Sequence, residues 1–309
     1  MITWEQRNLQ LRDINERVQR DAQAFISEEH GRYARQLQML TEAVKQRLQD
    51  RLLVLLSGPS SSGKTTTAEW LCRALAADGI TAHVISLDDF YRGRERAPIL
   101  PDGSYDYESV EALDLPLLRR CMSELLEQGE TLLPRFDFTT GRPAPDKRPL
   151  RIGHGAVVIF EGIHALNPHL EEDLSADTVP FKIFVHTGNA IFDGEQRLLS
   201  RRDLRLCRRI LRDARFRASE IENTMLMWPQ VMRGEDLYLF PYSDTADVRL
   251  DTTFAFEPCM TAPLILPQLP RIEGQYPDVA ERLRRALAPF VPLSADMLPP
   301  DALLREFFG

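Results

Sequence analysis

The sequence predicts an α/β fold in which a doubly wound parallel sheet carries helices on both faces. Short apolar runs typical of buried strands occur at 52–56, 83–87, 156–160 and 181–185, and helix-favouring stretches lie between them. A glycine-rich turn joins the first of these runs to a helical stretch. Strands that alternate with helices form parallel sheets, and ligands bind at the carboxyl ends of such strands.

The chain divides into three predicted parts. Residues 1–50 are polar with apolar positions at helical spacing, which predicts an N-terminal extension of one or two helices. Residues 51–255 contain the strand pattern and are expected to form the core domain. Residues 256–309 are rich in proline, with one helix near 277–288, and are interpreted as a C-terminal cap on that domain.

Several further elements follow from local patterns within the core domain. A helix is expected near 111–128, where Gly129 would end it. Residues 131–153 alternate and carry glycine and prolines, which predicts a β-hairpin. An arginine-rich helix is expected over roughly 194–217, with another helix after it, and 247–250 is expected to be a late strand.

The composition is that of an ordinary globular protein and limits the function classes. Of the 309 residues, 43% are hydrophobic and 27% are charged. The sequence has no stretch of about 18 apolar residues, the length that a membrane-spanning helix needs. The four cysteines form no CxxC pair, so we interpret them as reduced thiols and expect a cytoplasmic protein. A net charge of −8 argues against a protein that coats nucleic acid.

The segment from Gly58 to Thr65 matches the pattern GxxxxGK[ST] of a phosphate-binding loop, or P-loop. The alternative is a Gly/Ser turn that only happens to precede a helix. The motif lies between a predicted strand and a predicted helix, which is the context that a P-loop requires, so we interpret it as a P-loop. Backbone N–H groups and the helix N-terminus favour bound phosphates. Lys64 would reach the β and γ phosphates of ATP, and the Thr65 hydroxyl would bind Mg²⁺. The residues expected to bind ATP are Gly58, Ser60, Ser61, Ser62, Gly63, Lys64, Thr65 and Thr66.

Acidic residues follow two of the predicted strands. Asp88 and Asp89 come directly after the second strand, and Glu161 comes after the strand at 156–160. The alternative is that the two aspartates only cap the next segment, but ligands collect at this edge of a parallel sheet. A hydroxyl that attacks a phosphate needs a base, and a metal needs oxygen ligands, so these acids are candidates for both roles.

The arginine-rich stretch allows two interpretations. Residues 197–217 carry nine arginines, which could bind a nucleic-acid backbone or neutralise a transferred phosphoryl group. Arg205, Arg209 and Arg212 share one helical face, which suits a single ligand, whereas Arg208 and others are expected to pair with acids on a solvated surface. The acidic chain and the P-loop favour the second interpretation and make nucleic acid unlikely as a partner.

Several short segments resemble the uridine kinase and phosphoribulokinase family. They are LDDFY (87–91), FDF (136–138), VVIFEG (157–162) and RLCRRILRD (205–213). Two further segments, MWPQVMRGEDLYLFP (227–241) and LLREFFG (303–309), resemble a bacterial uridine kinase-like branch that is often fused behind domains shared with threonyl-tRNA synthetase. The resemblance covers roughly residues 40–309 and implies a P-loop kinase whose β-hairpin helps to form the acceptor pocket.

The resemblance also implies roles for individual residues. Asp88 takes the place of the catalytic aspartate, and Glu161 matches a glutamate associated with magnesium. Acceptor contacts are implied for Tyr91, Phe136, Phe138 and Arg209, and phosphate contacts for Arg212 and Arg217. Asp106 corresponds to the acid that holds the ribose hydroxyls, with Glu108 as a competitor because the spacing differs by one residue.

The implied activity is transfer of the ATP γ-phosphate to the 5′-hydroxyl of a nucleoside, with uridine or cytidine as the expected acceptor. Where the family has a histidine that reads the base, this sequence has Gly141, so we expect loose recognition of the base. Two alternatives stay open: a kinase of another small hydroxylated metabolite, and an ATP-binding regulatory module with weak turnover. A homo-oligomer is compatible with the sequence.

Overall fold

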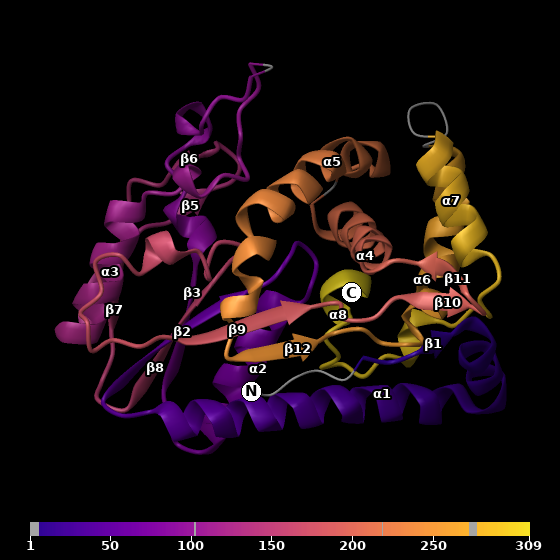
Figure 1. Cartoon of the computed structure of the whole chain (residues 1–309), viewed down its shortest axis with the longest axis horizontal. Coiled ribbons are helices and arrows are strands. Elements are labelled where there is room, and N and C mark those ends of the chain that lie inside the picture. The colour runs from indigo at the N-terminus through magenta and orange to yellow at the C-terminus, as the bar shows by residue number, and fades with distance from the viewer. Residues whose placement is uncertain (1–5, 102, 218, 272–276) are drawn as a thin grey trace.

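A sheet of five parallel strands forms the centre of the molecule (Figure 1). The computed structural model describes residues 6–101, 103–217, 219–271 and 277–309. The spatial order β12-β9-β2-β8-β3 is made by Arg51–Ser57 (β2), Ala82–Ser86 (β3), Ala156–Glu161 (β8), Phe181–His186 (β9) and Val248–Asp251 (β12). All four pairings in this sheet are parallel, so the predicted α/β class with a parallel sheet is confirmed.

The sheet separates two hydrophobic cores, and β2 shows why its sequence is a continuous apolar run. Leu52, Val54 and Leu56 face one core, and Leu53 and Leu55 face the other. Because successive strand residues point to opposite faces, a strand covered on both sides must be apolar at every position.

Helices cover both faces of the sheet. The first core is closed by α1 (Leu11–Arg47), α2 (Lys64–Ala77), α4 (Arg201–Phe216), α5 (Ile221–Tyr238), α6 (Glu257–Ile265), α7 (Pro277–Leu287) and α8 (Arg305–Phe308). The second core lies under α3 (Leu115–Glu127) and the 3₁₀ turn Leu87–Phe90 that follows β3. None of the helices within the described ranges is long and apolar enough to cross a membrane.

The long N-terminal helix α1 runs along one side of the molecule, as Figure 1 shows. It contains one break, because Asp21 has non-helical φ and ψ of −163° and 90°. The Asp21 carboxylate accepts a hydrogen bond of 3.0 Å from the backbone N–H of Ala24 and so caps the second part of the helix. The sequence predicted one or two helices here, and the structure has one helix, α1, with a kink at Asp21.

Two predicted helix starts were wrong, and side-chain capping explains each. The helix expected from 111 begins at Leu115, because the Asp114 side chain caps it. The hairpin predicted over 131–153 is present as two short antiparallel ladders: Glu130–Leu133 (β4) pairs with Arg148–Arg151 (β7), and Phe136–Asp137 (β5) pairs with Arg142–Pro143 (β6).

The second wrong boundary lies at the start of the arginine-rich helix, which was expected near 194. Residues Ile191–Asp193 (β10) and Gln196–Leu199 (β11) instead form a hairpin that turns at Gly194, with Leu9–Gln10 (β1) beside it. The helix begins only at Arg201, because Ser200 and Asp203 cap it reciprocally.

We predict that Leu40→Ala lowers the free energy of unfolding by about 2–5 kcal/mol, because it leaves a cavity in the first core. The Leu40 side chain is completely buried in α1, whereas that of its neighbour Met39 is half exposed. Met39→Ala is the matched control and should change stability by less than about 0.5 kcal/mol. Urea denaturation of both variants measures this difference, and equal losses would contradict the assigned face of α1.

Candidate active site

The phosphate-binding loop connects β2 to α2, as the motif predicted. Gly63 has φ +87° at the N-cap of α2, a conformation that side chains rarely adopt. At Gly58 a Cβ atom would lie only 2.0 Å from the backbone oxygen of Val185, so only glycine fits there. The residues predicted to bind ATP all lie in this loop or in the first turn of α2.

Side chains from other elements hold the loop through its carbonyl groups. Arg205 donates a hydrogen bond of 3.0 Å to the carbonyl oxygen of Ser60, and Arg208 donates one of 3.4 Å to the carbonyl oxygen of Ser61. The Thr252 hydroxyl, which follows β12, donates to the carbonyl oxygen of Ser62 at 2.8 Å. Three successive carbonyl groups therefore have donors within the protein, which orients the peptide planes of the loop.

The two arginines that hold the loop are themselves buried, which corrects the expectation for both. Arg205 was expected to converge with Arg209 and Arg212 on one ligand, but it forms a bidentate pair with Glu235 at 2.6 and 2.8 Å. Arg208 was expected on a solvated surface, but it is completely buried and forms a bidentate pair with Glu257 at 2.6 Å. Helices packed around α4 supply these acids, which periodicity alone could not place.

Three further arginines of this region gather around Asp213. This buried carboxylate lies 3.3 Å from Arg209, 2.9 Å from Arg212 and 3.6 Å from Arg217. Arg209 also donates to the Ser60 hydroxyl at 3.0 Å, so the cluster reaches the loop directly. The sequence prediction missed Asp213, although an acid among several arginines was a signal for it.

Three ionisable groups lie together at the carboxyl ends of the strands. Burial raises the pKa of Asp88, an effect that Lys64 and Arg217 oppose. Burial also raises the pKa of Glu161, again opposed by Lys64, and it lowers the pKa of Lys64. The Thr65 hydroxyl lies 3.4 Å from the Glu161 carboxylate. The structure thus brings the predicted base, lysine and metal ligands into one cluster.

The two neighbouring aspartates have different surroundings. Asp88 faces the charged cluster, whereas Asp89 accepts a hydrogen bond of 3.1 Å from the backbone N–H of Phe136. That bond ties the β5–β6 hairpin to the turn after β3. Asp89 therefore positions the hairpin, and Asp88 is the acid left to face a ligand.

An aromatic group lies beside Asp88. The Tyr91 and Phe136 ring centroids are 5.7 Å apart, and those of Phe136 and Phe138 are 5.1 Å apart. Burial raises the pKa of Tyr91 well above its usual value, and the charges of Asp88 and Glu108 add to this effect. Phe138 is 58% exposed, so its ring forms the outer edge of the group.

The structure separates the two acids that competed for the ribose position. Asp106 accepts hydrogen bonds from the Tyr238 hydroxyl at 2.8 Å and from Arg233 at 3.3 Å. Burial raises the pKa of Glu108 to about 7; the charge of Arg209 opposes this shift, and the charges of Glu235, Asp88 and Asp106 add to it. Gly234 in α5 permits this position, because a Cβ there would lie 2.3 Å from the Glu108 Cβ.

Gly141 lies at the tip of the hairpin with φ +68°, where its Cα is covered by Arg94. The Arg94 Nε would lie 2.7 Å from a Cβ at this position, and the Arg94 N–H donates to the Gly141 oxygen at 3.1 Å. A side chain at this point would force Arg94 to move, and the positive φ also favours glycine here.

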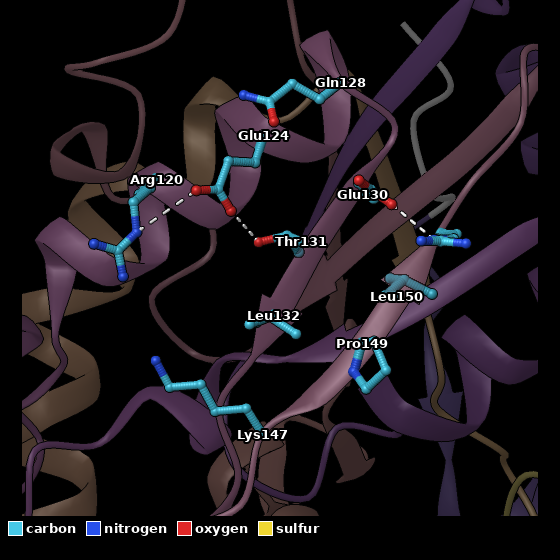
Figure 2. Close-up of a pocket in the computed structure, with 10 residues that line it drawn as sticks. Arg120, Glu124, Gln128, Glu130, Thr131, Leu132, Lys147, Pro149 and Leu150 are labelled. Carbon is cyan, nitrogen blue, oxygen red and sulfur yellow. Dashed lines mark hydrogen bonds and ion pairs between the residues drawn. The ribbon is translucent and has the colours of Figure 1, made fainter.

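A separate surface cavity of about 460 Å³ lies between α3 and the β4–β7 ladder (Figure 2). Four of its charged side chains form two pairs: Glu124 lies 3.8 Å from Arg120, and Glu130 lies 2.7 Å from Arg151. None of the P-loop residues or strand-end acids lines this cavity, which is therefore distinct from the candidate active site.

Residues 53–254 match the model of the phosphoribulokinase/uridine kinase family. The chain belongs to this family. It is 32% identical to a uridine kinase of Mycoplasma genitalium over 59% of this chain and 75% of that protein. It is 28% identical to a mouse uridine-cytidine kinase-like protein over 62% of this chain but only 32% of that longer protein. A possible uridine kinase from Bacillus stearothermophilus aligns with a TM-score of 0.49 and 18% identity over 71% of this chain and 98% of that one.

The residues of this family member fit ATP and Mg²⁺ by their chemistry. The loop packs on Val185 so tightly that a Cβ at Gly58 is excluded. The Lys64 ammonium group donates a hydrogen bond of 3.2 Å to the carbonyl oxygen of Pro59 in the same loop. The Thr65 hydroxyl and the Glu161 carboxylate present neighbouring oxygen atoms, the donors that Mg²⁺ prefers together with phosphates and water.

Proposed function

We propose that this protein transfers the γ-phosphate of ATP to the 5′-hydroxyl of a nucleoside, as the names of its relatives suggest. The observation that carries the proposal is the position of Asp88. It follows β3 at the sheet edge that carries the P-loop, and the charges of Lys64 and Arg217 act on it there. An acid that lies between a phosphate-binding lysine and an aromatic group suits proton transfer from an acceptor hydroxyl.

In this mechanism the protein neutralises charge and removes one proton. The loop N–H groups and Lys64 hold the phosphates, and Arg212 and Arg217 face the charge that spreads over the transferred group. Asp88 accepts the proton as the acceptor oxygen bonds to the γ-phosphorus and the bond to the ADP oxygen breaks. Mg²⁺, held by Thr65 and Glu161, would neutralise part of the phosphate charge.

The proposed acceptor site lies between the aromatic group and the acids. Tyr91 and Phe136 would stack on a base, which every base satisfies because each has a π-face. Glu108 would accept hydrogen bonds from the two ribose hydroxyls, with Arg209 beside it. Asp106, the other candidate for the ribose, would instead hold Tyr238 and Arg233 in place.

An acceptor panel tests this function. We expect phosphorylation of uridine, cytidine, adenosine and guanosine, with kcat/KM values within about a thousandfold of one another, because Gly141 provides no group to select the base. We expect 2′-deoxyuridine to be a much poorer acceptor, because it lacks one of the hydroxyls that Glu108 would bind. A larger preference for uridine would contradict loose base recognition, and no ADP release with any nucleoside would refute the acceptor class.

We expect Asp88→Asn to lower kcat by about 10²–10⁴-fold, because the amide cannot accept the proton of the acceptor hydroxyl. Asp89→Asn is the matched control, since the asparagine oxygen can still accept the hydrogen bond from Phe136. It should change kcat only slightly. Steady-state kinetics with ATP and uridine give both values, and the reverse order would show that Asp89 is the base.

The pKa of Glu108 predicts a pH dependence of nucleoside use. Only the ionised carboxylate can accept both ribose hydrogen bonds, so kcat/KM for uridine should rise as the pH increases through about 7. In Glu108→Gln this rise should be absent and kcat/KM should be low throughout. A profile that keeps the same midpoint in the variant would assign the titration to another group.

A further inference from the structure

The C-terminal segment, residues 298–309, lies directly against the phosphate-binding loop. The Leu303 side chain would lie 2.8 Å from a Cβ at Gly63, the glycine that precedes the P-loop lysine. Leu303 is buried there, and α8, which follows it, packs against α4 (Figure 1). The chain thus brings residues that are about 240 positions apart into contact at the nucleotide site.

One acidic side chain of this segment accepts a hydrogen bond from the first turn of α2, directly after the loop. The Thr66 hydroxyl donates a hydrogen bond of 2.5 Å to the carboxylate of Glu306. Thr66 lies in the first turn of α2, where the helix N-terminus and the loop together favour an anion. The Glu306 carboxylate is therefore an internal anion at a position suited to phosphate.

Electrostatic effects on nearby cations agree with this position. Burial lowers the pKa of Lys64, and the charges of Glu161, Asp88 and Glu306 oppose that shift. Burial also lowers the pKa of Arg217, and Glu306 is one of the acids that oppose it. Glu306 thus acts on two cations that the proposed mechanism uses to hold phosphates.

Packing and hydrogen bonds hold the residues on either side of Glu306. The Phe307 ring is buried 5.1 Å from the guanidinium of Arg208, which also donates to the loop. Arg305 donates to the carbonyl oxygens of Leu298, Pro299 and Gly309 within the same segment. Glu306 itself is only partly buried.

We propose that Glu306 sets the affinity of the nucleotide site, because its carboxylate competes with the phosphates of the nucleotide for Thr66 and for the cations of the P-loop. A phosphate that approaches Thr66 must displace Glu306 or bind beside a like charge, and both weaken binding. This inference rests on the proposed use of a nucleotide by the P-loop, but it does not depend on which acceptor is phosphorylated.

Binding measurements with Glu306→Gln test the inference, since the amide keeps the size of the side chain and removes its charge. The probes are ATP, tripolyphosphate and adenosine, titrated calorimetrically at constant Mg²⁺ concentration. We expect the variant to bind ATP and tripolyphosphate about five- to tenfold more tightly than the wild type, within the usual range of coupling between sites. Adenosine, which has no phosphate, should bind within about twofold of its wild-type affinity.

Glu69→Gln is the matched control, because Glu69 lies on the same helix as Thr66 but is exposed and pairs with Arg73. It should leave all three affinities unchanged. Equal or weaker ATP binding in Glu306→Gln would overturn the inference, and weaker adenosine binding would make Glu306 a direct ligand of the nucleoside. Tighter phosphate binding in a protein that phosphorylates no nucleoside would support the inference and contradict only the proposed acceptor.

Discussion

The geometry of the active site depends on the contacts that α4 makes with the carbonyl groups of the phosphate-binding loop. Arg205 and Arg208 each donate to one of these carbonyl groups and each form a bidentate pair with a buried acid, Glu235 or Glu257. A guanidinium has five donors in a planar fork, so one side chain can satisfy both partners. The loop is therefore held from behind, and its N–H groups do not have to be organised by the ligand.

Buried ion pairs of this kind add little net stability, because desolvation of two charges offsets most of their attraction. Their effect here is geometric. Glu235 also accepts a hydrogen bond of 2.9 Å from the Ser60 N–H, so the same acid contacts both the loop and Arg205. Preorganised charges of this type are worth more at an active site than flexible ones, because they need no rearrangement during the reaction.

The remaining charges of the site lie in two places, one beside the loop and one beside the aromatic rings. Asp213 gathers arginines near the loop, whereas Asp88 and Glu108 lie toward the aromatic rings of Tyr91 and Phe136. Asp89 keeps the aromatic hairpin in position through one backbone hydrogen bond. Asp89 and Asp106 are thus engaged in hydrogen bonds within the protein, and the proposed function uses their near neighbours Asp88 and Glu108.

The sequence by itself determined the sheet, through its apolar runs, and the phosphate-binding loop, through one motif. It also determined the positions of Asp88 and Glu161, because the carboxyl ends of parallel strands lie at the same edge of a sheet. It did not determine which arginines of α4 are buried, since helical spacing shows which residues share a face but not what packs on that face. The contact between Thr66 and Glu306 joins positions 240 residues apart and has no local signal. Only the tertiary structure decided these contacts, because a charged side chain is buried where another element supplies its partner.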